Sequence, residues 1–225
     1  MRGVFVTGTD TGVGKTVVAA AICAQASARG LSVAAFKPVV TGLDEPAPRW
    51  PRDHELLAGV ASAGQTANDV APHRYGPAVS PHFAEQLAGE EIDPDSLVAA
   101  ARAEAAKADA LVVEGVGGLL VPLTNDYLVR DFAGELSLPL VIAARPGLGT
   151  ISHSLLTIEA ARAVALRIQA VVLTPWDEEP SAMERSNMQT IERFGEVPVI
   201  GLPRTQPERV AEAGAMLPVS DWLSP

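Results

Sequence analysis

Residues 4–16, VFVTGTDTGVGKT, constrain the fold of this chain more than any other stretch. The apolar run at 4–6 predicts a buried strand, and the Ala- and Val-rich stretch at 17–28 predicts a helix. A glycine-punctuated turn that ends in Lys15-Thr16 lies between them. A strand, a glycine loop, Lys-Thr and a helix is the arrangement that wraps the phosphates of a nucleoside triphosphate.

The glycine spacing of this phosphate-binding loop (the P-loop, residues 8–16) departs from the usual pattern. That pattern has four residues between the first glycine and Gly-Lys-Thr. Here the position of the first glycine is taken by Thr9, and the glycine, Gly8, stands one residue earlier. A glycine-rich turn before an ordinary helix is therefore the alternative interpretation.

Composition limits the class of protein. A chain of 225 residues is long enough for one domain with a substantial core, and only 4% of the residues are aromatic. The formal charge of −10 argues against a nucleic-acid-binding or anionic-membrane-binding surface. No apolar run reaches the roughly 20 residues of a membrane span, and the first one leads straight into the P-loop instead of forming a signal peptide. We expect a single cytoplasmic domain, residues 1–225, without a disulfide because Cys23 is the only cysteine.

A second apolar run, 32–36, ends at Lys37-Pro38, and Thr41 follows shortly after. Proline cannot donate a ladder hydrogen bond, so the strand is expected to stop there. Lys37 and Thr41 then lie at the carboxyl end of a strand, where open α/β sheets bind their ligands. A solvated lysine at a strand end is the alternative for Lys37.

Two acidic residues are candidates for holding Mg²⁺. Glu114 ends an apolar strand at 110–113 and precedes a glycine run, which resembles the acidic strand end of P-loop proteins. Its alternative is an ordinary structural turn. Asp53 stands at the start of a short helical pattern, where an aspartate usually serves only as a cap. His54 and His73 have no partner at metal-ligand spacing and are expected on the surface.

The remaining chain continues the alternation of strands and helices. Strands are predicted at 139–144, 168–173 and 197–202, and helices at 83–88, 93–107, 150–165 and 181–194, with Thr150 as a cap. Pro46, Pro48 and Pro51 predict a stiff connection before the helix that begins near Asp53. The pattern predicts an α/β protein with a doubly wound, mainly parallel sheet that has helices on both faces.

Five motifs together resemble one family over essentially the whole chain. They are GTDTGVGKT (8–16), KPVVTG (37–42), SPH (80–82), VEGVGG (113–118) and LGTISH (148–153). Their order and spacing are similar to those of the dethiobiotin synthetases, a family of P-loop ligases. The P-loop also occurs in related ATPases, whereas KPVxxG together with SPH and VEGxGG is more specific.

The resemblance implies an ATP- and Mg²⁺-dependent ring closure in biotin biosynthesis. The substrate would be 7,8-diaminononanoate (7,8-diaminopelargonate), which has two adjacent amines. One amine takes up carbon dioxide as a carbamate, and the carbamate oxygen attacks the γ-phosphate of ATP to give a carbamic–phosphoric anhydride. The second amine then attacks the carbonyl, expels phosphate and closes the cyclic urea, dethiobiotin.

The resemblance also assigns residues to the nucleotide and the metal. Lys15 and Lys37 would be catalytic with Thr11 in the same pocket, and Thr16, Asp53 and Glu114 would hold Mg²⁺. The nucleotide would also contact two backbone stretches, Gly12, Val13, Gly14, Lys15, Thr16 and Val17 around the phosphates, and Gly115, Val116 and Gly117 after Glu114. Residues expected around the base are Thr174, Pro175, Leu202, Pro203 and Arg204.

The diamine is expected to bind at a subunit interface, because the family works as a homodimer. Thr41 and Lys37 would contact the amine end. The carboxylate tail would bind a helix start of the partner subunit, which is sound for an anion. In this chain those residues are Gly149, Thr150, Ile151 and Ser152, together with Asn187.

Two positions depart from better-known members of the family. Thr174 stands where an Asn reads the adenine edge, and a hydroxyl cannot make the paired donor and acceptor contact of an amide. Base selectivity is therefore expected to be weaker or different. Ser152 replaces a frequent Asn, which changes the expected contact with the carboxylate tail.

Three other readings of the motifs are possible. A partitioning or septum-placing ATPase would have a second lysine in the pattern KGGVGKT, where this chain has Asp10. An amide-forming ligase of the cobyrinate type would need a glutaminase domain with a nucleophilic cysteine, which Cys23 inside the first helix cannot supply. A nucleotide-binding regulatory module would have no use for Lys37 and Thr41 beside the phosphates.

Overall fold

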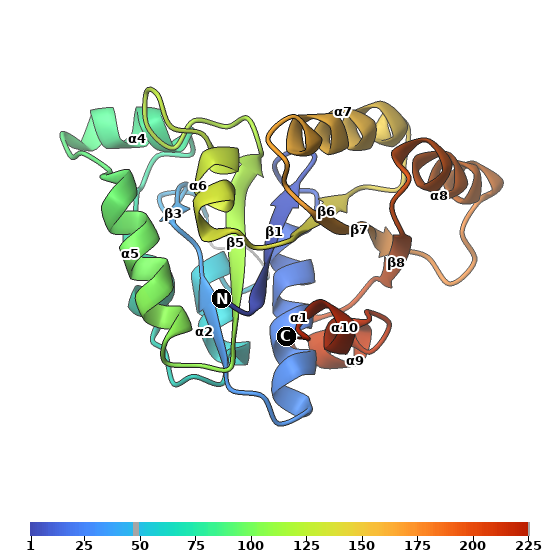
Figure 1. Ribbon diagram of the computed structural model, residues 1–225, viewed down its shortest axis with the longest axis horizontal. Coiled ribbons are helices and arrows are strands. Elements are labelled where there is room, and N and C mark those ends of the chain that lie inside the picture. The colour runs from blue at the N-terminus through green and yellow to red at the C-terminus, as the bar shows by residue number, and fades with distance from the viewer. Residues whose placement is uncertain (47–49, 225) are drawn as a thin grey trace.

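The structure is a computed structural model that describes residues 1–46 and 50–224; Pro48 of the predicted connection lies outside them. Its main sheet has six parallel strands in the order β2-β5-β1-β6-β7-β8 (Figure 1). Their bounds are β1 Gly3–Gly8, β2 Val33–Phe36, β5 Ala110–Gly118, β6 Leu140–Ala144, β7 Ile168–Trp176 and β8 Val199–Pro203. A second, parallel pair joins β3 (Val39–Val40) to β4 (His73–Arg74).

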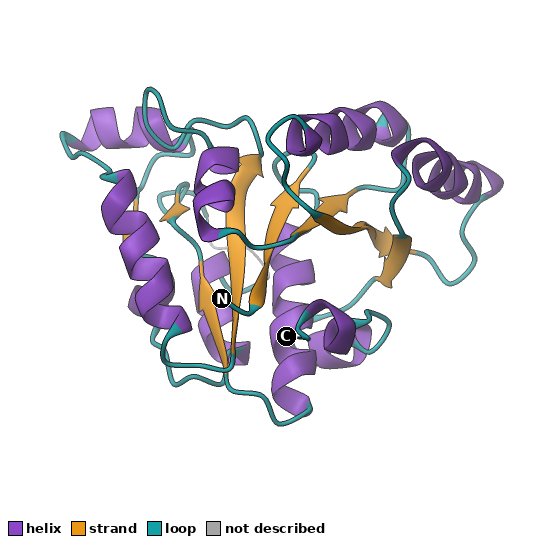
Figure 2. Ribbon diagram, viewed as in Figure 1, coloured by secondary structure: helices purple, strands orange, loops and turns teal. Residues whose placement is uncertain are grey.

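Helices cover both faces of the main sheet, as the coloured ribbon makes plain (Figure 2). On one face α1 (Lys15–Ala28) packs with α2 (Asp53–Val60), α9 (Val210–Gly214) and α10 (Val219–Trp222). The other face is covered by α5 (Pro94–Ala105) and α6 (Val129–Leu136) on one side and by α7 (Thr150–Arg162) and α8 (Ala182–Gly195) on the other. Shorter elements are α3 (Ala67–Val70), α4 (Pro81–Ala88) and a 3₁₀ turn, Pro207–Arg209.

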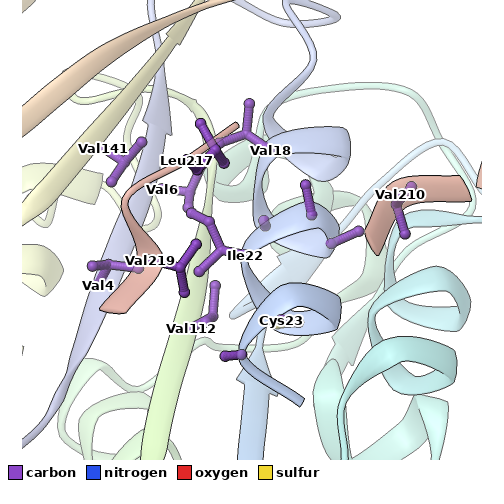
Figure 3. Close-up of a cluster of buried hydrophobic side chains, with 14 of the residues drawn as sticks. Val4, Val6, Val18, Ile22, Cys23, Val112, Val141, Val210, Leu217 and Val219 are labelled. Atoms are coloured by element: carbon purple, nitrogen blue, oxygen red, sulfur yellow. The ribbon is translucent and has the colours of Figure 1, made fainter. Parts of the chain in front are cut away.

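The alternation of side chains along β1 divides the core into its two layers. Val4 and Val6 pack toward α1, with Ile22 and Val112 (Figure 3), whereas Phe5 packs toward α6. Val4, Phe5 and Val6 are fully buried, as expected for the central strand of a parallel sheet. The predicted fold class, a doubly wound parallel sheet, is confirmed.

The structure corrects several expected boundaries. The strand predicted at 110–113 continues through the glycine run to Gly118 because β5 keeps pairing with β1 up to Gly8. Gly149, in the left-handed conformation, is the N-cap of α7; Thr150, the expected cap, is the first helical residue and makes no side-chain capping bond. That helix ends at Arg162, three residues before the predicted end, and Ala165 adopts a positive φ of 57°.

Two further corrections concern regions where tertiary contacts decide the structure. His54, expected on the surface, is only 6% exposed because α2 packs against α1. The short helices α9 and α10 after β8 were not predicted, and they pack against α1 close to the N-terminal edge of the sheet (Figure 1).

Among the described residues, no helix is both long and apolar enough to cross a membrane.

Candidate active site

The P-loop joins β1 to α1 at the carboxyl end of the sheet. Gly14 is the N-cap of α1 with φ 95°, so the loop turns directly into the helix at Lys15. A Cβ on Gly14 would lie 2.5 Å from the methyl group of Thr174, so only glycine fits between the loop and β7. The N-terminus of α1 therefore points its free N–H groups toward the carboxyl end of the sheet, as an anion site requires.

Strand register brings Lys37 and Glu114 side by side. Phe36 of β2 pairs with Val113 of β5, so Lys37, just after β2, lies at the level of Glu114 in β5. Lys37 Nζ lies 2.6 Å from Glu114 Oε1 and 2.8 Å from Asp53 Oδ2 at the start of α2. Thr16 Oγ1 donates to the same Glu114 Oε1 at 2.9 Å. The group Lys37, Asp53, Glu114 and Thr16 is called the carboxylate cluster below.

Burial makes the charges of this cluster depend on one another. Lys37 is 4% exposed and Glu114 1% exposed. Burial alone would lower the pKa of Lys37, but Asp53 and Glu114 together hold that pKa above its usual value. Burial raises the pKa of Glu114, and the Lys37 ammonium opposes the shift. The Lys37 ammonium is thus the cation that keeps two carboxylates together at the sheet edge.

Lys15 lies across from this cluster on the P-loop side. Its Nζ donates to the backbone oxygen of Asp10 at 2.9 Å, and only 6% of the residue is exposed. Burial lowers the pKa of Lys15 to about 8, with Glu114 opposing the shift. Asp10 Oδ1 accepts from Thr11 N at 2.7 Å, so the aspartate folds back onto the loop.

A cavity of about 700 Å³ connects the P-loop, the carboxylate cluster and Thr41. Most of the residues predicted for phosphate, metal and amine binding line it, namely Thr11, Gly12, Gly14, Lys15, Thr16, Val17, Lys37, Thr41, Asp53, Glu114, Val116 and Gly117. The structure therefore brings two lysines and two carboxylates that are far apart in the sequence around one cavity. Whether each residue performs its predicted role stays a prediction.

Other residues of the cavity wall were not predicted as site residues. They are Val39, Trp50, Pro51, Leu56, Ala78, Val79, Ser80, Pro81 and Val121. The SPH motif was the available signal for Ser80 and Pro81. Nothing in the sequence pattern pointed to Trp50, which reaches the cavity from the segment before α2.

Two residues of the predicted phosphate-binding stretches do not line the cavity. Val13 is 3% exposed and packs in the core around α1. Gly115 faces the core instead, since a Cβ there would lie 2.9 Å from the ring of Phe5. Contacts of these two residues with a nucleotide could involve only their backbone.

The residues predicted around the base do not line the cavity either. Thr174 is 4% exposed, and its methyl group lies against the P-loop at Gly14. Trp176 of β7 pairs with Pro203 of β8, so the predicted base residues 174–175 and 202–204 gather at neighbouring strand ends beside the P-loop. Leu202 is fully buried, whereas Pro175 and Arg204 are exposed.

The residues predicted to bind the carboxylate tail lie at the start of α7, also outside the cavity. Gly149 and Ser152 are exposed, Ile151 is half-buried, and Thr150 is buried with a hydroxyl that has no hydrogen-bond partner in the described part of the chain. Asn187 of α8 has a structural contact, because its Nδ2 donates to Pro146 O at 2.9 Å and to Gly147 O at 3.3 Å. Its amide nitrogen thus holds the loop that leads into α7.

The carboxylate cluster fits a divalent cation such as Mg²⁺. Thr16 Oγ1 and the two carboxylates supply oxygen ligands, which Mg²⁺ prefers. Glu114 Oε2 is buried and has no hydrogen-bond partner among the described residues. No group of three or more His, Cys, Asp or Glu side chains in residues 1–46 and 50–224 could hold a metal alone. A cation here would need phosphate oxygens or water to complete its coordination.

Comparisons with known proteins agree with this arrangement. The family described as "AAA domain" matches residues 2–207. Solved structures of a ParA family ATPase from Chlorobium tepidum TLS (TM-score 0.55, 16% identity, 98% of this chain and 92% of that one) and of the septum site-determining protein MinD from Pyrococcus horikoshii OT3 (TM-score 0.51, 17% identity, 98% and 88%) are similar in fold. At these identities the likeness shows the fold alone.

Sequence relatives are much more similar. ATP-dependent dethiobiotin synthetase BioD of Anaeromyxobacter dehalogenans strain 2CP-1 is 43% identical over 80% of this chain and 81% of the relative. The proteins of the same name from strain 2CP-C of that species (38%, covering 96% of each chain) and from Bacillus subtilis strain 168 (34%, covering 90% and 87%) also match. The P-loop, the carboxylate cluster, the parallel sheet and these relatives together show that the chain belongs to the dethiobiotin synthetase family of P-loop proteins.

Proposed function

We propose that this protein is a dethiobiotin synthase, a cyclo-ligase that forms carbon–nitrogen bonds. It converts 7,8-diaminononanoate, carbon dioxide and ATP into dethiobiotin, ADP and phosphate, with Mg²⁺ as cofactor. The observation that carries the proposal is the single cavity that Lys15 and Lys37 share with Thr16, Asp53 and Glu114. Family membership supports the choice of substrate.

Lys15 and the P-loop backbone bind the β- and γ-phosphates. The Lys15 ammonium leaves the Asp10 carbonyl for the phosphate oxygens, which are stronger partners because they carry charge. The backbone N–H groups from Gly12 to Val17 surround the phosphates at the N-terminus of α1. Thr11 lies on the wall of the same cavity.

Mg²⁺ is proposed to be held by Thr16, Asp53 and Glu114. When bound, it offsets the negative charge of the phosphate oxygens. In this proposal the cation replaces the Lys37 ammonium, which lies 2.6 Å from Glu114 and 2.8 Å from Asp53.

Lys37 is then free to bind the carbamate next to the γ-phosphate. A carbamate and a triphosphate repel each other, so a cation between them lowers the barrier to their reaction. The carbamate oxygen attacks the γ-phosphorus and ADP leaves. The second amine attacks the carbamoyl carbon and inorganic phosphate leaves, which closes the ring. Thr41, on the same cavity wall, orients the amine end.

We further propose that two copies of this chain form the working enzyme, with the substrate site at their interface. Support comes from large apolar side chains exposed on and beside α7 and α8, where the tail-binding residues lie. These are Leu148 (90% exposed), Leu156 (62%), Met183 (41%) and Phe194 (61%). Gly149, Thr150, Ile151 and Ser152 of the partner copy then receive the substrate carboxylate at the start of α7. Asn187 acts indirectly by holding the preceding loop.

The negative net charge and the lysine-lined cavity favour small anionic ligands over nucleic acid or membrane lipids. The proposed place of action is the cytoplasm.

Asp10 argues against a partitioning ATPase, because it puts an anion where those ATPases have a lysine that reaches across their dimer. An amidotransferase-type ligase is disfavoured because burial raises the pKa of Cys23, so its thiol stays protonated and unreactive.

The experiment that tests the proposal is incubation of the protein with 7,8-diaminononanoate, ¹³C-bicarbonate, Mg²⁺ and ATP. We expect ¹³C in a cyclic urea and one phosphate released per ring closed. A 1,8-diamine of similar length serves as the control substrate, because its amines are too far apart for a five-membered ring. ATP hydrolysis without labelled product would contradict the proposal.

A further inference from the structure

Arg145, in the loop between β6 and α7, contacts the P-loop from outside the cavity. Its Nη2 donates to Gly12 O at 3.2 Å and to Thr11 O at 3.4 Å. The residue is exposed and does not line the cavity that holds Lys15 and Lys37. The guanidinium therefore lies on the outer side of the loop whose inner side is proposed to hold the phosphates.

The backbone on both sides of Arg145 is anchored. Upstream, β6 pairs with β1 so that Gly8 lies beside Ala143, and Thr9 N donates to Ala143 O at 3.0 Å. Downstream, Asn187 holds the carbonyl groups of Pro146 and Gly147. The position of Arg145 relative to the P-loop is thus fixed by the sheet and by α8.

The two carbonyl groups that Arg145 contacts belong to the peptide units that carry the N–H groups of Gly12 and Val13. A charged donor on a carbonyl oxygen makes a stronger hydrogen bond than a neutral one and polarises the peptide, so its N–H becomes a better donor. Gly12 has φ 69°, and a Cβ there would lie 3.2 Å from Nη2. Glycine thus lets the guanidinium approach the loop closely.

The contact also places a positive charge near the Asp10 carboxylate. Asp10 Oδ1 accepts from Thr11 N, so an anion lies on one side of Thr11 while Arg145 lies on its carbonyl side. The Asp10 carboxylate weakens the attraction of the loop for phosphate, and the Arg145 guanidinium adds a second cation, besides Lys15, that offsets it.

We propose that Arg145 is a positioning residue for nucleotide binding. It holds the Thr11–Gly12 segment in its phosphate-binding conformation and increases the affinity of the loop for the triphosphate, without touching the reacting atoms. The inference rests on the proposed binding of ATP at the P-loop. It adds a residue that none of the five sequence motifs contains.

The test compares Arg145→Gln, Arg145→Lys and the wild type by calorimetric titration with ADP and with a non-hydrolysable ATP analogue. We expect binding to be about 5-fold weaker in the Gln variant, since about one charged hydrogen bond is lost at a partly solvated site. The Lys variant keeps the positive charge but loses the planar, forked geometry of the guanidinium, so it should recover part of the affinity for nucleotide. The dependence of Kd on salt should also be shallower in the Gln variant. Arg167→Gln, an exposed arginine just before β7 at the opposite edge of the sheet, is the matched control.

Steady-state kinetics separate positioning from a general structural effect. Arg145→Gln should raise KM for ATP more than it lowers kcat, and the melting temperature should match that of the control. Unchanged affinity and salt dependence would overturn the inference. An equal loss of affinity and salt dependence in the Arg167 variant would overturn it too. If the Gln variant does not fold, wild-type affinity and salt dependence in the Lys variant would count against the fork geometry. Because these titrations need no diamine, failure of the proposed ring closure would leave their result standing.

Discussion

Lys37 is buried between Asp53 and Glu114, the two carboxylates proposed to bind Mg²⁺. The sequence predicted that these three residues come from separate strand and helix ends, and strand register brings them together. The sequence could not predict that the Lys37 ammonium pairs with the two carboxylates, because their partner depends on which cation is present. The observed arrangement therefore differs from the proposed one, in which Lys37 acts on the carbamate.

Replacing Lys37 with Gln should abolish ring closure while nucleotide binding remains. The change removes the cation that stabilises the transferred phosphoryl group, so we expect kcat to fall by about 100-fold or more. Product formation and ADP titration measure the two effects separately. Lys107→Gln is the matched control, because that lysine is 58% exposed and pairs with Glu104 on the surface. Near-normal turnover in Lys37→Gln would refute the role of this residue.

Replacing Glu114 with Gln should raise the Mg²⁺ concentration needed for half-maximal rate. The variant loses one of two negative charges around the proposed metal, and we expect an increase of about tenfold or more. The rate is measured as a function of free Mg²⁺ at saturating ATP, with the exposed Glu91→Gln as control. An unchanged Mg²⁺ requirement would mean that Glu114 does not bind the metal.

Thr174 should give this protein weak selectivity for the base of the nucleotide. Its methyl group lies against Gly14, and a threonine has no amide with which to read adenine. We expect kcat/KM values for ATP, CTP and GTP within about tenfold of one another, because no paired amide contact discriminates between them. A strong exclusive preference for ATP would contradict this expectation.

At the scale of secondary structure, close packing of α1 against its neighbours holds the P-loop in place. Gly214 of α9 meets α1 so closely that a Cβ would lie 2.3 Å from Ala21 O. Because that atom belongs to the backbone of a helix, it cannot move aside easily. The short C-terminal helices thus stabilise the helix whose first residues are Lys15 and Thr16.

Gly214→Ala should destabilise the fold by about 1–3 kcal/mol, since overpacking forces α9 away from α1. Urea unfolding followed by circular dichroism measures the difference. Gly134→Ala in α6 is the matched control, because open space surrounds that glycine and alanine favours a helix by up to about 1 kcal/mol. Equal effects of the two substitutions would show that the contact between α9 and α1 is unimportant.

The strand–loop–helix unit and the parallel strands could be predicted because their signals are local. Apolar runs and glycines mark them, as at β1 and α1. The burial of His54 and the helices α9 and α10 depend on contacts with α1 that residues far along the chain supply. The extension of β5 to Gly118 likewise depends on its partner, β1. Sequence periodicity contains none of this information.

For the whole molecule, the parallel sheet explains how much of the site could be predicted. Parallel strands end at one edge, so Lys15, Lys37 and Glu114 were expected there together. The expected base and tail residues, by contrast, lie outside the cavity of one chain. The proposal that a second copy completes the site rests on exposed Leu148, just before α7, and exposed Phe194, near the end of α8.

The central claim is that Lys37 leaves its carboxylates and meets the carbamate beside the γ-phosphate that Lys15 binds. A crystal structure of the protein with 7,8-diaminononanoate, bicarbonate, Mg²⁺ and a non-hydrolysable ATP analogue tests it most directly. The account predicts a carbamate oxygen within hydrogen-bond distance of Lys37 Nζ and the γ-phosphate on Lys15 Nζ. It would be contradicted by a diamine bound in another cavity while Lys37 stays paired with Asp53 and Glu114.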